Sequence, residues 1–241
     1  GMARLAHELV TKKRTAVDAG VDTAYWQRID MRWPHASDQH NINTESMFLR
    51  ACRRESTDYT PVWLLRQAGR YQRAYMNLKG DMDFLDMCKT PELTAEITLM
   101  AVERLGVDAA IIFADILPIL QPMGFSLEYI KGTGPVIHNP IRSGRAVDQL
   151  EEVHPESQHY VYEAIRLARP ALPPTIPLIG FSGAPFTLAA YAIEGRSSRN
   201  FQYVKSFMYS DPGAWHAFME KIARAITGYL NEQIEAGVQA I

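Results

Sequence analysis

The sequence predicts an α/β fold with a parallel sheet, because short apolar segments of strand length alternate with longer stretches of helical pattern. The apolar segments lie at residues 62–65, 107–113, 176–181 and 238–241. An open doubly wound sheet and a TIM barrel both fit this alternation. Because the chain stops where a fourth strand begins, a barrel would be present only over about its first half to two-thirds.

The composition indicates a globular protein. The 241 residues are 47 % hydrophobic and 22 % charged, and a net charge of −2 gives no global basic field for nucleic acid. No apolar run approaches the ~18 residues that a membrane span needs. Two distant cysteines, Cys52 and Cys88, have no CxxC spacing and favour a reducing, cytoplasmic setting.

The N-terminal residues 1–45 are polar and mixed in charge, and they predict an extension or arm, with a possible helix over residues 3–17. Asn43 or Thr44 is the expected N-cap of a short helix that follows. The first strand is then expected at residues 62–65.

The middle of the chain predicts a helix and a hairpin. Thr90 as N-cap and Pro91 at the first helical position start a helix that stops at Gly106. The second strand, residues 107–113, is apolar except for Asp108, as expected of a strand buried on both faces. A Gly-containing turn between residues 125–130 and 135–137 suggests the hairpin.

The C-terminal half predicts four helices and two further strands. Asp211 caps the longest helix, and Gly237 ends it. The helices are expected at residues 155–169, 186–193, 200–209 and 212–236, and the strands at residues 176–181 and 238–241.

Two arginines follow the first predicted strand. Arg66 and Arg70 are four residues apart and share a face if the turn is helical. Each guanidinium can bind a carboxylate or phosphate through two hydrogen bonds, and Gly69 lets the backbone approach a ligand. Strand ends of α/β proteins are where anions bind. The alternative is a solvated surface turn with salt bridges.

Asp115 stands at the carboxyl end of the second predicted strand. A carboxylate is costly to bury without partners, and this end of a barrel carries active sites. The alternative is a loop aspartate that caps the turn over residues 116–118. Because two arginines are expected at the same sheet end, we favour a functional role.

A glycine-containing turn over residues 180–187 follows the third predicted strand, with Tyr191 just downstream. Neither a GxGxxG pattern nor a following GK[ST] supports a phosphate loop. Ser182 lacks the second glycine of a nucleophile elbow, because Ala184 stands there. The seven histidines form no HExxH pattern, so a zinc site in this chain is not expected.

Three ordered motifs carry a family resemblance. Residues 61–71 resemble the N-terminal signature of the uroporphyrinogen decarboxylase family, and residues 113–117 resemble its second block. Residues 180–187, with Tyr191 and residues 193–195, resemble its third. The resemblance covers about residues 45–241 and implies a decarboxylase barrel domain over residues 46–241 that is truncated at the C-terminus.

The resemblance implies a TIM barrel, a homodimer when complete, and no metal or organic cofactor. The implied reaction removes carbon dioxide from the four acetate side chains of uroporphyrinogen and gives coproporphyrinogen for haem synthesis. The implied substrate is a porphyrinogen, and neither a nucleic-acid nor a membrane partner is expected. The implied catalytic residues are Asp115 and Arg66, and the implied substrate-binding residues are Arg66, Gln67, Ala68, Gly69, Arg70, Asp115 and Tyr191.

The implied chemistry is consistent with these side chains. Eight substrate carboxylates suit an arginine-lined cleft, and Asp115 beneath a pyrrole ring would stabilise developing positive charge. Arg66, the implied proton donor, is chemically difficult as an acid because a guanidinium holds its proton tightly. Two alternatives stay open: a corrinoid-dependent methyltransferase of the same superfamily, which binds zinc through later His and Cys residues, and a non-catalytic half-barrel.

Overall fold

The structure is a computed structural model, and it describes residues 46–241. The expected arm over residues 1–45, its helix at residues 3–17 and the expected caps Asn43 and Thr44 lie outside the described residues.

The parallel strands pair in the order of the chain. Strands β1 (Ala110–Ile111) and β4 (Leu178–Ile179) are parallel neighbours, and Ala240 forms a parallel bridge with β4. Two residues before β1, the Asp108 backbone N–H donates to the Val62 carbonyl oxygen at 2.8 Å. This order has no reversal. It is the order of a barrel wall, and it also occurs within one half of a doubly wound sheet, whose strand order reverses only at the switch point.

The strand expected at residues 62–65 was wrong, because its pairing is confined to Val62. The Asp108 carboxylate accepts the Val62 backbone N–H at 2.7 Å and so takes the place of a backbone acceptor. The next N–H that pairs, that of Leu64, donates to the Gln67 side chain at 3.0 Å, and Leu65 lies in a turn with 75 % exposure. The hydrogen bond from the Val62 N–H to the Asp108 carboxylate accounts for Asp108, the one acidic residue in the apolar run 107–113.

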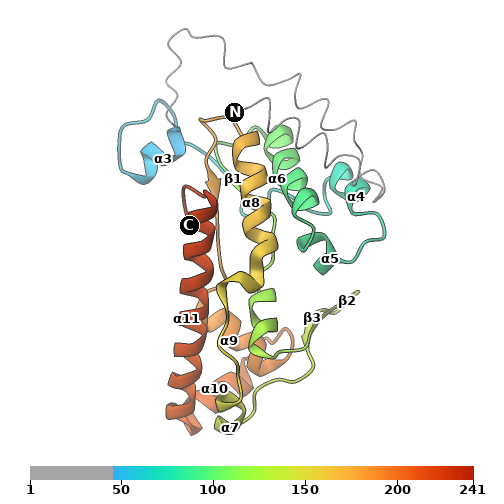
Figure 1. The fold of residues 1–241 in the computed structure, drawn as a ribbon, viewed down its shortest axis with the longest axis vertical. Coiled ribbons are helices and arrows are strands. Elements are labelled where there is room, and N and C mark those ends of the chain that lie inside the picture. Colours follow the sequence, from blue (N-terminus) through green and yellow to red (C-terminus); the bar gives the residue numbers. More distant parts are fainter. Residues whose placement is uncertain (1–45) are drawn as a thin grey trace.

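The long helices match their expected positions. Helix α6 (Pro91–Leu105) ends at Gly106, whose φ of +61° is a left-handed conformation that favours glycine. Helix α11 (Pro212–Ala236) begins at Asp211, whose carboxylate accepts the Ala214 N–H at 3.0 Å. Helix α8 (His159–Ala171), preceded by the 3₁₀ turn η2 (Pro155–Gln158), packs on both. The three helices lie side by side in Figure 1.

The remaining helices are shorter. Ser46 caps α3, since its hydroxyl oxygen accepts the Leu49 N–H at 3.2 Å. Helices α9 and α10 were expected, whereas α4, α5, α7 and η1 span too few residues to show a clear period in the sequence. Their bounds are α3 (Met47–Cys52), α4 (Arg73–Lys79), α5 (Phe84–Cys88), η1 (Pro118–Met123), α7 (Gly144–Asp148), α9 (Pro185–Glu194) and α10 (Gln202–Ser210).

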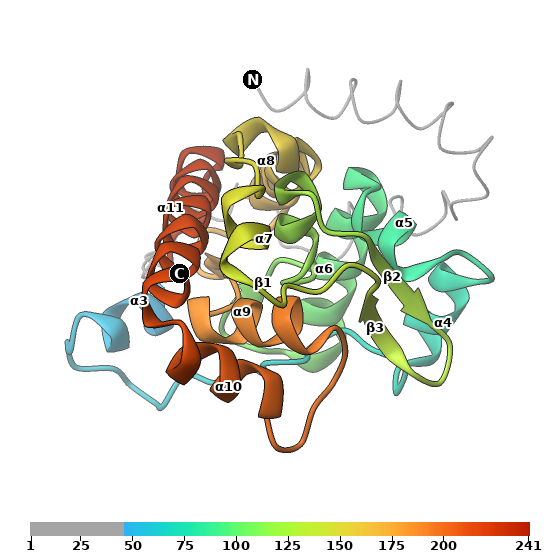
Figure 2. The ribbon, with the colours of Figure 1, turned by 90° about the horizontal axis from the view of Figure 1, so that it is seen from below.

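The expected hairpin is confirmed. Strands β2 (Leu127–Ile130) and β3 (Gly134–Ile137) pair antiparallel. The hairpin lies beside α4 and α5 at one edge of the molecule (Figure 2). It therefore lies on the side of the molecule where α4 follows the turn over residues 66–70, which we call the arginine turn.

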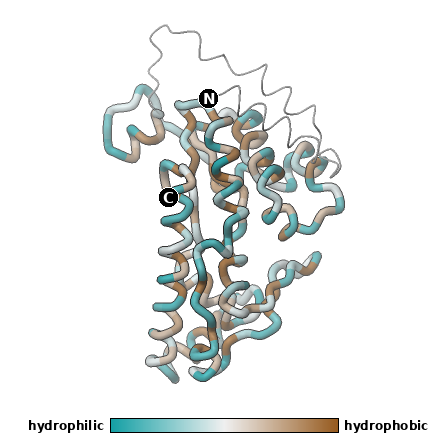
Figure 3. The backbone as a smooth tube through the Cα atoms, viewed as in Figure 1, coloured by the Kyte–Doolittle hydropathy of each residue, from teal (hydrophilic) through white to brown (hydrophobic). Residues whose placement is uncertain are grey.

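Two hydrophobic clusters hold the elements together. The larger one contains buried residues of α6, α8, α11 and the strands. Figure 3 shows hydrophobic and hydrophilic stretches alternating along these helices. The smaller one joins α4 and α5 to α6 through Tyr75, Met87, Leu93, Ile97 and Met100. This second cluster fixes the segment that follows the arginine turn. Among the described residues, no helix is both long and apolar enough to cross a membrane.

Candidate active site

Asp115 follows the carboxyl end of β1 by four residues, and hydrogen bonds to one of its carboxylate oxygens hold it in place. The segment that leads to it is held to α6, because the Phe113 N–H donates to the Thr98 hydroxyl at 2.9 Å. The Oδ1 atom of Asp115 accepts hydrogen bonds from the Leu117 backbone N–H at 2.9 Å and from the phenolic O–H of Tyr129. The first bond shows that Asp115 does cap the following turn. The second brings in a side chain from another element.

The electrostatic setting of Asp115 is apolar. Burial raises the pKa of its carboxyl above the ordinary value, and the hydrogen bonds from Tyr129 and Leu117 oppose that rise. Burial is also the main cause that raises the pKa of the Cys88 thiol, and the Asp115 charge adds to it. The carboxylate therefore lies where a positive charge would be strongly attracted.

Four aromatic rings pack on one another next to Asp115, and one of them, Tyr129, donates a hydrogen bond to it. Phe113 packs edge-on against Tyr75 at a centroid distance of 5.8 Å and against Phe84 at 6.0 Å. Phe84 also packs on Tyr129 at 5.2 Å. We call Tyr75, Phe84, Phe113 and Tyr129 the aromatic cluster. It joins α4, α5 and β2 to the segment that carries Asp115.

The arginine turn is ordered by its own backbone and by its middle residues. Gln67 is buried, and Ala68 and Gly69 are half-buried, whereas Arg66 and Arg70 are exposed. The Gln67 carbonyl oxygen lies 2.5 Å from the Tyr71 hydroxyl, which donates to it. The turn therefore holds its shape while both guanidinium groups face outward.

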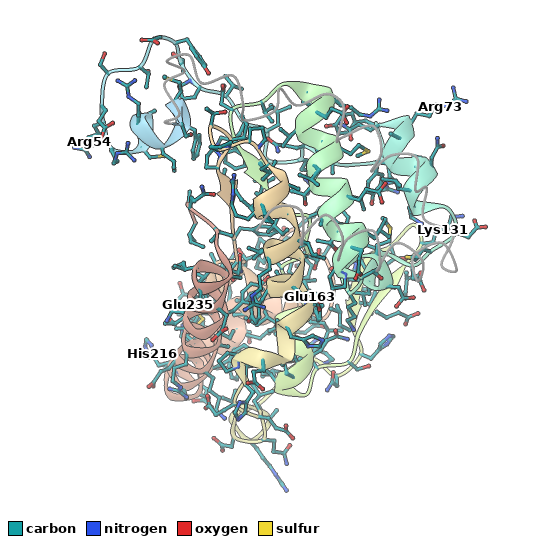
Figure 4. All side chains as sticks on the ribbon, turned by 45° about the horizontal axis from the view of Figure 1, so that its top comes forward. Arg54, Arg73, Lys131, Glu163, His216 and Glu235 are labelled. Atoms are coloured by element: carbon teal, nitrogen blue, oxygen red, sulfur yellow. The ribbon has the colours of Figure 1, made fainter. Side chains whose placement is uncertain are left out.

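Neither arginine has an ion-pair partner among residues 46–241, so the salt-bridged alternative is not what this part of the chain forms. Burial raises the pKa of Tyr75, Cys88 adds to that rise, and the Arg70 charge partly opposes it. Arg70 is thereby linked to the aromatic cluster. Arg73 and Lys131 point outward on the same side of the molecule (Figure 4).

Tyr191 lies on α9, half-buried against the larger hydrophobic cluster. It is among the groups that raise the pKa of Tyr129. The structure thus brings Asp115, Tyr129 and Tyr191 to one region. It records no direct contact between this group and Arg66 or Arg70.

The glycines of the turn over residues 180–187 serve packing. A Cβ on Gly180 would lie 2.4 Å from the Gln233 side-chain oxygen, and one on Gly183 would lie 2.8 Å from Leu188. Gln233 is fully buried and binds the Phe181 backbone through both amide atoms, each at 2.9 Å. Close approach between elements therefore accounts for these glycines.

Tyr129 was not predicted as a site residue. The hairpin was expected, but nothing in the sequence indicates that one tyrosine in it reaches Asp115. Among the described residues, no group of three or more His, Cys, Asp or Glu side chains could hold a metal ion.

Comparison with known proteins connects this geometry to a family. Residues 43–241 match the family model described as "Uroporphyrinogen decarboxylase (URO-D)". Curated proteins named uroporphyrinogen decarboxylase are similar, including that of Chloroflexus aurantiacus, with 55 % identity over 195 residues, 80 % of this chain and 55 % of the relative. That of Carboxydothermus hydrogenoformans is 53 % identical over 80 % of this chain and 56 % of its own length.

The chain thus spans little more than half the length of the curated relatives it matches. Among solved structures, a methyltransferase from Methanosarcina mazei superposes with a TM-score of 0.64 and 19 % identity. The superposition covers 82 % of this chain and 57 % of that protein. At this identity the likeness concerns the fold alone.

Proposed function

Because the chain belongs to the uroporphyrinogen decarboxylase family, we propose that the protein removes carbon dioxide from the acetate side chains of uroporphyrinogen and yields coproporphyrinogen. One observation carries the proposal. Asp115 is a half-buried carboxylate whose two recorded hydrogen bonds both go to Oδ1. Among the described residues, Oδ2 has no hydrogen-bond partner, so it is available to a cationic or N–H-bearing ligand.

The substrate's charge suits the arginine turn. Uroporphyrinogen carries eight carboxylates around a ring of pyrrole N–H groups. Arg66 and Arg70, which have no ion pair among residues 46–241, supply bidentate donors for the side-chain carboxylates. Gln67, Ala68 and Gly69 shape the turn that presents them. In this proposal Tyr191 contacts a substrate side chain.

The chemistry needs an electron sink. A proton added to the ring carbon next to the one that bears the acetate makes the ring cationic and leaves the substituted carbon conjugated with that charge, which the Asp115 carboxylate stabilises. The bond to the carboxylate then breaks, carbon dioxide leaves, and the bonding electrons neutralise the ring. A second proton converts the resulting methylene to a methyl group, and the ring returns the first proton. The net change replaces CO₂ by H⁺.

Arg66 is the proton donor in this proposal, as the resemblance implies. A guanidinium stays protonated at all physiological pH values, so it always carries the proton, but it releases the proton reluctantly. Charge stabilisation by Asp115 lowers the barrier to that transfer, because the cation forms next to a fixed anion. The two residues are therefore expected to act together.

We extend the proposal to a complete eight-unit barrel and a homodimer. The strand order without reversal and the fold likeness at a TM-score of 0.64 support the barrel. The family resemblance supports the dimer. The methyltransferase alternative gains no support from its structural likeness, since 19 % identity carries no information on activity.

Binding and turnover test the function. Binding is measured by titrating coproporphyrinogen, the product, into the 241-residue chain. Turnover is measured as carbon dioxide released from carboxyl-labelled uroporphyrinogen by the same protein. Asp115→Asn should nearly abolish release while circular dichroism stays unchanged, because it removes charge but little volume. Near-normal release in this variant would contradict the role of Asp115. Stoichiometric bound zinc without decarboxylation would favour the methyltransferase.

A further inference from the structure

The two oxygens of Asp115 are in unequal surroundings. Both recorded hydrogen bonds, from the Leu117 N–H and from the Tyr129 hydroxyl, go to Oδ1. Leu117 is two residues away in the same turn, so its bond orients the side chain relative to its own backbone. Tyr129 lies 14 residues further along the chain, in β2. Its bond therefore fixes the carboxylate relative to the hairpin.

We propose that Tyr129 is a positioning residue for Asp115: its phenol holds Oδ1 in place and keeps the carboxylate ionised, so that Oδ2 is presented to the substrate. The inference rests on the proposed function of Asp115 for its catalytic consequence. Its structural part, that Tyr129 controls the ionisation of Asp115, stands without that function.

The phenol of Tyr129 is itself held in place. In the antiparallel pair β2–β3, Tyr129 lies opposite Pro135. Its ring packs on Phe84 at a centroid distance of 5.2 Å, and Phe84 packs in turn on Phe113, two residues before Asp115. A donor held by packing in this way loses little side-chain entropy when it binds, so its hydrogen bond is effective.

The groups that interact electrostatically with Asp115 or Tyr129 are phenols and the Cys88 thiol, and Lys89 acts in turn on that thiol. Burial is the largest cause that raises the pKa of four of them, so these four stay neutral at physiological pH: Cys88, Tyr129, Tyr160 and Tyr229. No lysine or arginine of the described residues is among the causes that shift Asp115. The surrounding groups are Cys88 of α5, Tyr129 of β2, Tyr160 of α8, Tyr191 of α9 and Tyr229 of α11.

The consequence is that hydrogen bonding replaces a countercharge. An arginine beside Asp115 would keep it ionised but would also repel the cationic ring formed during decarboxylation. A neutral phenol stabilises the anion and leaves its charge available to the substrate. Tyr129 thus serves both needs, because it opposes the effect of burial without neutralising the carboxylate.

The test measures the titration of Asp115 directly. The 241-residue chain is labelled with ¹³C at aspartate carboxyl carbons, and NMR titrations compare wild type, Tyr129→Phe and the control Tyr162→Phe. Tyr162 also donates a hydroxyl hydrogen bond, to the Pro155 carbonyl oxygen at 2.8 Å, and Asp115 is not among the causes that shift its pKa. Asp115→Asn identifies the resonance.

In Tyr129→Phe we expect Asp115 to titrate at higher pH than in wild type, whereas Tyr162→Phe leaves it unchanged. Identical titration of Asp115 in wild type and Tyr129→Phe would overturn the proposal. If Tyr129→Phe does not fold, site-specific 3-fluorotyrosine at position 129 replaces it. The fluorinated phenol is a stronger donor, so Asp115 should then titrate at lower pH, a direction that loss of packing cannot produce.

Ligand binding separates the two proposals. Coproporphyrinogen affinity of Tyr129→Phe should fall about tenfold at the acid end of the pH range and much less at its alkaline end, because a hydrogen bond to a charged group favours the ionised form. If the wild-type chain binds no coproporphyrinogen, the proposed function fails, and the NMR comparison still decides the role of Tyr129. A loss of affinity that is equal at every pH would contradict control of ionisation.

Discussion

The close approach of the Gln233 side chain to Gly180 leads to a quantitative prediction about stability. Gln233 is fully buried, and its amide donates to the Phe181 carbonyl and accepts the Phe181 N–H, each at 2.9 Å. A Cβ on Gly180 would lie 2.4 Å from the same Gln233 oxygen. We therefore expect Gly180→Ala to act mainly by displacing the Gln233 amide from Phe181.

The magnitudes follow from the groups involved. Gln233→Ala removes two hydrogen bonds and leaves two backbone groups of Phe181 without partners, which costs about 3 kcal/mol of unfolding free energy. Gly180→Ala adds overpacking and loses the same pair of bonds, so it also costs about 3 kcal/mol. In the double variant, the Cβ added at position 180 no longer meets the Gln233 side chain. The loss of unfolding free energy should therefore be about 4 rather than about 6 kcal/mol.

Urea unfolding of the 241-residue chain, followed by circular dichroism, gives the four free energies of this double-mutant cycle. Gly183→Ala is the matched control, because its Cβ would meet Leu188 at 2.8 Å and Ile116 at 3.2 Å but not Gln233. Its cost should add to that of Gln233→Ala within about 0.5 kcal/mol. If the cost of Gly180→Ala also added to that of Gln233→Ala within about 0.5 kcal/mol, Gly180 and Gln233 would not be coupled and the reasoning would be refuted.

Three further predictions concern the site and its support. Arg66→Lys and Arg70→Lys should each weaken coproporphyrinogen binding about tenfold to a hundredfold in a direct titration, because lysine keeps the charge but loses the bidentate fork; unchanged affinity in both would make the turn an ordinary solvated one. Because burial raises the pKa of Asp115 above 3.8, ionising it costs the folded state. Asp115→Asn should therefore increase the unfolding free energy at pH 7, an advantage that disappears below about pH 3.8, where the carboxyl is protonated in both states; equal stability at pH 7 would contradict this. Arg169→Lys should cost about 2 kcal/mol in urea unfolding, since the guanidinium donates to several backbone carbonyls, the shortest bond being 2.7 Å, and a cost below 0.5 kcal/mol would show that these bonds contribute little.

Local signals in the sequence predicted much of the fold. The start of α6 at Pro91 and its end at Gly106, and the start of α11 after Asp211, were expected from residues within one helical turn. Asp115 was expected at the end of a strand over residues 107–113; β1 ends at Ile111, and Asp115 follows it by four residues. The first strand was wrong because an apolar run indicates burial in general, whereas residues 63–65 found no strand partner and Leu65 stayed exposed.

Tertiary structure alone decided which side chains meet. The bond between Tyr129 and Asp115 joins residues 14 positions apart, and the bonds between Gln233 and Phe181 join residues 52 positions apart. Caps and glycine turns act through the backbone over a few residues, so a single sequence displays them. A contact between distant side chains depends on how whole elements pack. The sequence by itself therefore determined where Asp115 stands, and only packing of the hairpin determined what holds its carboxylate.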